Sequence, residues 1–215
     1  MFKLESPFMN FLNKVADIMI LSIVFMIACI PVITGGAAFT AAYYMGFKMV
    51  KNEETYIIRG FFKAFKENFK QATLIWIFVL VLVALIFADY RIILYSELEF
   101  ASWMRIAMVT VTLVAVLGIV FLFPLQARFK NTVKNTIKNA FLMALSHLPS
   151  AFLLIAVYAV PYLLLYFVPQ LLPAVFLLGF GCIFYFKSFV LLKVFRRYEP
   201  EEPQEALEEE PQDGH

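Results

Sequence analysis

Residues 61–88 read FFKAFKENFKQATLIWIFVLVLVALIFA, a strip of phenylalanine and lysine that runs directly into an unbroken apolar segment. A helix needs about 17–25 apolar residues to cross the hydrocarbon core of a bilayer. Other segments of the 215-residue chain share this character, since 62% of all residues are hydrophobic and only 16% are charged. A soluble domain is less apolar and more charged. The sequence therefore predicts an all-α, polytopic membrane helix bundle.

The apolar residues fall into about six segments. They cover residues 13–33, 35–50, 72–89, 104–126, 140–167 and 171–192. The second is short, because its sixteen residues extend about 24 Å as a helix, less than the ~30 Å core. This second segment is a short span, a re-entrant half-span or an interfacial helix. The number of spans, six or five, depends on which of these it is. The first segment lacks a small-residue cleavage site, so we expect it to remain as an anchor.

The positive charges favour six spans with both termini in the cytoplasm. Lys and Arg concentrate in cytoplasmic loops, and this arrangement leaves only Arg91 and Arg105 on the opposite side. Five spans would move Lys3 and Lys14 outside. We expect residues 1–197 to form the membrane domain. Residues 198–215 carry eight of the sixteen acidic residues and no Lys or Arg, which predicts a disordered cytoplasmic tail.

Residues 61–72, here called the first elbow, are amphipathic. At about 100° per residue, the four phenylalanines lie on one helix face and Lys63, Lys66 and Lys70 on the other. This pattern is typical of a helix in the membrane interface, with rings in the acyl boundary and lysines among the headgroups. The alternative is a docking surface for a cytoplasmic partner. Nucleic acid is not expected, because the strip abuts a spanning segment.

Residues 129–140, FKNTVKNTIKNA, form a second elbow of the same kind. A shift of 68 residues places Phe61 on Phe129, and Lys66 and Lys70 on Lys134 and Lys138. The pair is a parallel repeat or a coincidence. Anionic lipid and an acidic partner surface remain alternative ligands for the two elbows. We call their lysines the basic platform: Lys63, Lys66, Lys70, Lys130, Lys134 and Lys138.

The break at Pro31, Gly35 and Gly36 is a candidate substrate contact. Interrupted helices in transporters expose backbone groups that bind substrate, and nearby hydroxyls could hydrogen-bond a sugar. The alternative is close helix packing through small residues. The candidate substrate-facing residues near this break are Thr34, Gly35, Gly36, Thr40, Tyr43 and Tyr44.

Two basic side chains lie deeper in apolar segments. His147 is a functional candidate because ionisable groups inside the membrane usually face the bundle interior. The alternative is a neutral imidazole bonded to Ser146, to Ser150 or to a carbonyl freed by Pro149. Lys187 is expected to extend its ammonium to the cytoplasmic edge.

The chain lacks the sequence patterns of common enzyme classes. It has no HExxH, GxSxG, phosphate-binding loop or zinc-ligand spacing, and its two cysteines lie apart in apolar segments. No pair of carboxylates lies within the apolar segments for a proton relay. We therefore expect no catalysis, no cofactor and no metal.

Four motifs together resemble a known family. They are IPVITGGAAFTAAYYMGFKMV, RGFFKAFKENFKQATLIW, FPLQARF and KNAFLMALSHLP, starting at residues 30, 59, 123 and 138. In this order they are similar to the YesL-like family of bacterial integral membrane proteins, a domain of unknown function often encoded near carbohydrate importers. The resemblance implies a bacterial plasma-membrane protein with an accessory or partner-binding role in carbohydrate uptake. Subunits of an ATP-driven sugar importer would be its partners. The alternative is a small-solute (sugar) transporter acting by itself.

Overall fold

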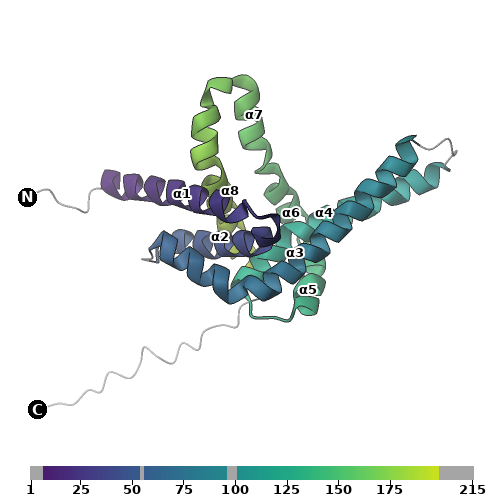
Figure 1. Ribbon diagram of the computed structural model, residues 1–215, viewed down its shortest axis with the longest axis horizontal. Helices are drawn as coiled ribbons and strands as arrows, with labels where there is room; N and C mark the ends of the chain where they lie inside the picture. The colour runs from purple at the N-terminus through teal and green to yellow at the C-terminus, as the bar shows by residue number, and fades with distance from the viewer. Residues whose placement is uncertain (1–6, 54–55, 96–100, 199–215) are drawn as a thin grey trace, which may run out of the picture.

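The computed structural model describes residues 7–53, 56–95 and 101–198, and within these ranges the chain is helical with no strand. The prediction of an all-α bundle is confirmed (Figure 1). The predicted acidic tail lies outside the described residues except for Tyr198. The elements are α1 (Pro7–Cys29), η1 (Val32–Thr34), α2 (Gly35–Val50), α3 (Ile57–Tyr95), α4 (Ser102–Arg128), α5 (Val133–Ser146), α6 (Leu148–Ala156), α7 (Ala159–Phe167), η2 (Pro169–Leu171) and α8 (Leu172–Phe195).

Five helical stretches in the described part of the chain are long and apolar enough to cross a membrane. They are Phe8–Cys29, Ile57–Ile93, Ser102–Arg128, Leu148–Phe167 and Pro169–Phe195. Most side chains of these stretches point away from the protein core, as lipid-facing helices require. The chain is therefore a multi-pass membrane protein.

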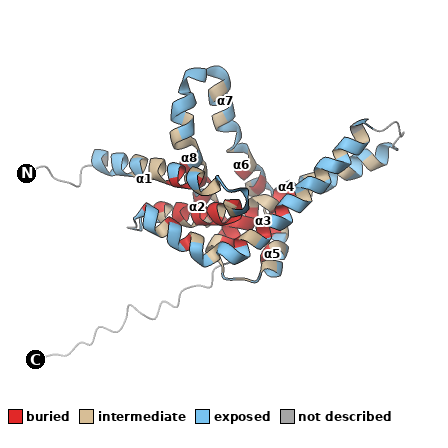
Figure 2. Cartoon of the chain, viewed as in Figure 1, coloured by how far each residue is buried: buried red, intermediate tan, exposed pale blue. Residues whose placement is uncertain are grey.

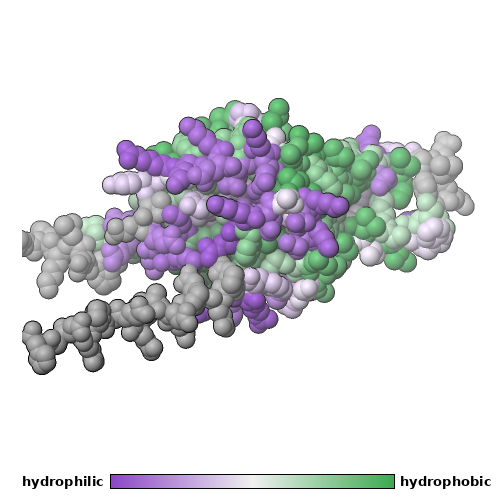
Figure 3. All heavy atoms as spheres, turned by 90° about the horizontal axis from the view of Figure 1, so that it is seen from below, coloured by the Kyte–Doolittle hydropathy of each residue, from purple (hydrophilic) through white to green (hydrophobic). Residues whose placement is uncertain are grey.

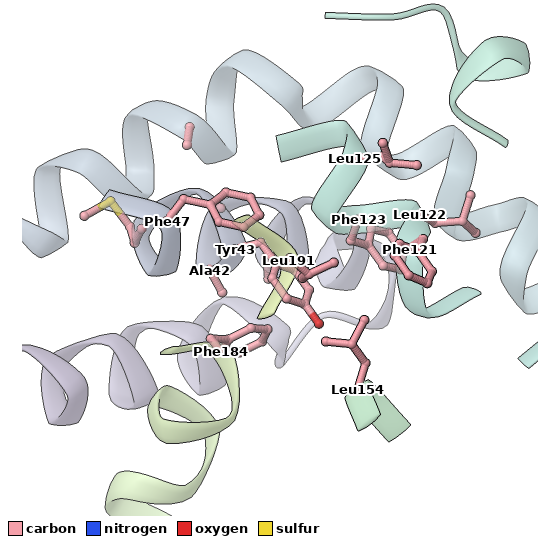
Figure 4. Close-up of a cluster of buried hydrophobic side chains, with 14 of the residues drawn as sticks. Ala42, Tyr43, Phe47, Phe121, Leu122, Phe123, Leu125, Leu154, Phe184 and Leu191 are labelled. Carbon is pink, nitrogen blue, oxygen red and sulfur yellow. The ribbon is translucent and has the colours of Figure 1, made fainter. Parts of the chain in front are cut away.

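The short second segment, α2, forms the centre of the bundle. Its sixteen residues include twelve that are buried and none that is exposed, as Figure 2 shows. Helices α1, α3, α4 and α8 all pack against it. An interfacial helix would keep one exposed polar face, and α2 has none. The core around α2 includes Tyr43, Phe184 and Leu191 (Figure 4).

A Schellman motif ends α2 and turns the chain toward α3. Asn52 adopts the left-handed conformation with φ 53°, which asparagine tolerates better than most residues. The Glu53 N–H donates to the Lys48 carbonyl at 3.1 Å, and the Asn52 N–H donates to the Met49 carbonyl at 3.3 Å. The Lys14 ammonium on α1 donates to the Asn52 side-chain oxygen at 2.9 Å and ties α1 to this turn.

The two elbows differ in their backbone. Residues 61–72 belong to α3, a single helix of 39 residues, so the first elbow continues into the membrane span without a break. In the second elbow, α4 ends at Arg128 and Phe129 is extended, with φ −115° and ψ 133°. Helix α5 then begins after Thr132, whose hydroxyl accepts the Asn135 N–H at 3.4 Å. The 68-residue offset therefore relates helix to helix at residues 65–72 and 133–140, but it relates helix to non-helical backbone at residues 61–64 and 129–132.

The predicted segment 140–167 is divided into the end of α5, then α6 and α7. Helix α6 begins directly after the non-helical His147, and Pro149 is its second residue. Pro161 lies in the first turn of α7, where its ring would clash with the carbonyl of Val157 in a continuous helix. The chain accordingly turns at Val157 and Tyr158. In Figure 1 the α7–α8 pair and the α3–α4 pair leave the core in different directions.

Candidate functional site

The six lysines of the basic platform are all exposed. Three lie on α3, and the other three lie on α5 and the loop before it. Helices α3 and α5 contact each other, so the two sets belong to one end of the bundle. Figure 3, seen from below, shows hydrophilic side chains gathered over much of this face. The structure thus brings the two predicted sets of lysines together.

A buried glutamine joins the helices that carry the platform. Gln126 on α4 is only 4% exposed, and its Nε2 donates to the Gln71 side-chain oxygen on α3 at 2.8 Å. The Asn68 side-chain oxygen, also on α3, lies 3.4 Å from the same nitrogen. From α5, the Thr136 hydroxyl donates to the Gln126 Oε1 at 3.3 Å. Buried polar groups satisfied in this way fix the positions of the elements they join.

The phenylalanines of the first elbow do not share one environment. Phe61 is completely buried in the bundle core, whereas Phe62 and Phe69 are exposed. Phe65 lies between them in exposure, and its ring is 6.3 Å from that of Phe61 and 5.5 Å from that of Phe69. The prediction that all four rings lie in lipid is therefore wrong for Phe61, because the bundle provides an apolar partner for that side of the helix.

Near the α1–α2 break, the threonine hydroxyls form hydrogen bonds with backbone carbonyls of the same chain. The Thr34 hydroxyl lies 2.6 Å from the Ala28 carbonyl and 2.7 Å from that of Pro31, both of which can accept its proton. The Thr40 hydroxyl donates to the Gly36 carbonyl one turn earlier, at 2.9 Å. These two hydroxyls are therefore already hydrogen-bonded within the chain.

Gly35 and Gly36 lie against α3. A Cβ at Gly35 would be 3.0 Å from the Trp76 indole, and one at Gly36 would collide with the Ala72 carbonyl. This arrangement favours the packing interpretation, in which small residues allow close backbone approach.

The remaining candidate residues do not form a common site. Tyr43 is 3% exposed, and its hydroxyl is hydrogen-bonded to that of Tyr158. Tyr44 is half-buried beside Lys48, whose ammonium lies 5.3 Å from the centre of its ring. His147 Nε2 is hydrogen-bonded to the Tyr198 hydroxyl at 2.8 Å, a partner that the sequence did not indicate.

Lys187 is the polar residue that sequence reasoning placed wrongly. It is 0% exposed, so its ammonium does not extend to the membrane edge. Its Nζ lies 3.7 Å from the centre of the Tyr158 ring and has no hydrogen-bond partner among the described residues. The predicted segment ended at residue 192, whereas α8 continues to Phe195, about 12 Å of helix beyond Lys187. That distance is too long for a lysine side chain to cover.

No group of three His, Cys, Asp or Glu side chains that could hold a metal occurs among the described residues. Cys29 and Cys182 are both free thiols.

Residues 17–90 match the model of a family described as "Protein of unknown function, DUF624". The matched region contains most of α1 and α3, all of α2 and the first elbow. No curated protein and no solved structure matches the chain. The central helix and most of α1 and α3 are therefore similar to a family whose activity is unknown.

Proposed function

We propose that this chain is a YesL-like protein of the bacterial plasma membrane that acts without catalysis, as an accessory or partner-binding component of carbohydrate uptake. The observation that carries this proposal is the basic platform, with six exposed lysines on helices connected through Gln126. The partner would present an acidic surface, and a subunit of an ATP-driven sugar importer is the candidate.

The charge of the platform is available for binding. Exposed lysines contribute little to folding, whereas complementary charge accelerates encounter with a partner and selects among partners. The Gln126 network holds α3, α4 and α5 together before binding, and a preorganised surface loses less entropy when a partner docks. Anionic lipid headgroups are the competing ligand for the same ammonium groups.

The alternative, a sugar transporter acting by itself, has weaker support. Its best candidate contact was the break between α1 and α2. There, the Thr34 and Thr40 hydroxyls are bonded to the chain itself, and Gly36 is in close contact with α3.

The test is co-purification from native membranes, followed by mass spectrometry. A variant with Lys66, Lys70, Lys134 and Lys138 changed to Gln should lose its partner while remaining folded and inserted. The matched control removes four positive charges elsewhere, by changing the exposed residues Lys51, Lys193, Arg196 and Arg197 to Gln, and should keep the partner.

Two outcomes would contradict the proposal. Recovery of every partner by the platform variant, with loss of binding only to anionic vesicles, would assign the lysines to lipid. Sugar uptake by the purified protein alone in liposomes would favour the transporter.

A further inference from the structure

An apolar cavity of about 630 Å³ lies between α6–α7 and α8. Its size is within the range of about 300–1,000 Å³ that is usual for small-molecule sites. The lining is aliphatic and aromatic and includes Val157, Pro161 and Leu164 on one side, with Leu178, Cys182 and Val190 on the other. A ligand of this cavity must therefore be apolar over most of its length.

The buried ammonium of Lys187 lies beside this cavity. Ile183 and Val190 both line the cavity, and they flank Lys187 at four residues before and three residues after, on the same face of α8. From the other side, Val157 lines the cavity and directly precedes Tyr158, whose ring covers the Lys187 Nζ. The ammonium thus lies under the Tyr158 ring, and chain neighbours of both residues belong to the cavity wall.

This charge is incompletely compensated. Lys187 is fully buried, and its Nζ has no hydrogen-bond partner among the described residues. A cation–π contact offsets only part of the cost of removing an ammonium from water. An ionisable group in this position inside a membrane protein indicates a functional site. A bound anion would supply the missing partner.

Tyr158 is placed to uncover the ammonium. It lies in the break between α6 and α7, and its side chain is 46% exposed. Rotation about its side-chain torsions would remove the ring from the Lys187 Nζ. The hydroxyls of Tyr158 and Tyr43, now bonded to each other, could then donate to the same anion. In Figure 4 the Tyr43 oxygen is directed toward Leu154 of α6.

We propose that this cavity binds a long-chain carboxylate, with the acyl chain between α7 and α8 and the carboxylate on Lys187 and the tyrosine hydroxyls. A small anionic group is required, because the ammonium is fully buried beneath the Tyr158 ring. The apolar lining requires a hydrocarbon tail. This site is independent of the basic platform, which lies on α3 and α5.

The test uses a photoreactive long-chain fatty acid and the full chain in nanodiscs of neutral phosphatidylcholine. Labelled residues should map to the cavity, oleate should compete, and methyl oleate should not, because it lacks the charge. Lys187→Met should lower labelling by about tenfold to a hundredfold, the usual range for loss of one charged hydrogen bond. Lys193→Met, at an exposed position on the same helix, should leave labelling unchanged.

A second variant tests the tail of the ligand without altering Lys187. Gly179 lines the cavity, and a Cβ there would meet only the Val175 side chain at 3.4 Å. Gly179→Leu should therefore fill the cavity and reduce labelling while the protein keeps its elution profile. If Lys187→Met does not fold, this variant alone tests whether the fatty acid binds in the cavity.

The proposal is overturned if both folded variants label like the wild type. Equal competition by methyl oleate would also overturn it, since the charge would then be irrelevant. Competition by phosphatidylglycerol but not by oleate would assign the cavity to a phospholipid instead.

Discussion

The Trp76 indole Nε1 donates a hydrogen bond of 2.7 Å to the backbone carbonyl of Val32, 44 positions earlier in the chain. The same indole packs against Gly35. One side chain of α3 therefore fixes the turn through which α1 leads into the central helix. The Val32 carbonyl also accepts the backbone N–H of Gly35, so the indole is the second donor to this oxygen.

Trp76→Phe should destabilise the protein by about 0.5–1.5 kcal/mol, because the Val32 carbonyl keeps only the Gly35 N–H as a donor and the aromatic contact shrinks. The measurement is thermal unfolding of the purified protein in detergent. Trp103→Phe is the matched control, since Trp103 is 69% exposed and should be near neutral. Equal effects of the two changes would show that the indole hydrogen bond contributes nothing.

Gly36→Ala should cost about 1–3 kcal/mol, because the added methyl would collide with the Ala72 carbonyl on α3. Gly179→Ala should be neutral or stabilising by up to about 1 kcal/mol, since alanine favours helix and space is open there. The same unfolding assay compares them. A stable Gly36→Ala protein would mean that α2 and α3 separate more easily than their packing indicates.

Gln126→Leu should destabilise the bundle by about 1–3 kcal/mol, since the buried Thr136 hydroxyl loses its acceptor. It should also weaken partner recovery while all six platform lysines remain. Gln71→Ala, which alters an exposed residue of the same network, should have a smaller effect on both. Full partner recovery by a folded Gln126→Leu protein would show that the network does not organise the platform.

Lys187→Met should raise the stability of the ligand-free protein by about 1 kcal/mol. A lysine at the centre of a membrane helix costs about 2.5–3.5 kcal/mol, and the lost cation–π contact with Tyr158 offsets about 2 kcal/mol of that gain. Lys193→Met should change the melting temperature little. A large loss of stability in Lys187→Met would instead indicate that the ammonium has a structural partner.

The predicted topology can be tested by cysteine labelling in a background where Cys29 and Cys182 are replaced by alanine. Cysteines at Lys66 and Tyr198 should be protected in intact cells from an impermeant thiol reagent, whereas one at Ser102 should react. Positive charges near the first two positions and their scarcity near the third give this expectation. The reverse pattern of labelling would invert the orientation.

The bundle was predictable from the sequence because long apolar segments leave few alternatives in a membrane. The central position of α2 was not, although its glycines and alanines indicated packing. Burial on all sides depends on α1, α3, α4 and α8 meeting around α2, and no local pattern specifies that arrangement. Pro161 could have predicted the break at Val157 and Tyr158. The sequence is apolar on both sides of this break, so composition does not show the boundary between α6 and α7.

Side-chain partners were harder to predict than helices. His147 is hydrogen-bonded to Tyr198, 51 residues away. The ring of Tyr158, between α6 and α7, lies over the ammonium of Lys187 on α8. Such pairs depend on tertiary contacts, whereas sequence spacing shows only neighbours on one helix. The lysines of the elbows were easier to place, because charge on one face of a helix beside a membrane span is itself a local signal.

The burial of α2 also sets the order in which the protein can be completed during synthesis. Helix α2 is made early, yet α8, one of the helices that cover it, begins only at residue 172. Until α8 arrives, the Gly46 side of α2 lacks the Ser188 surface against which it finally packs. A nascent chain that stops before residue 172 therefore holds an unfinished core in the bilayer. Quality-control proteases that recognise incomplete membrane bundles would act on that state until α8 covers α2.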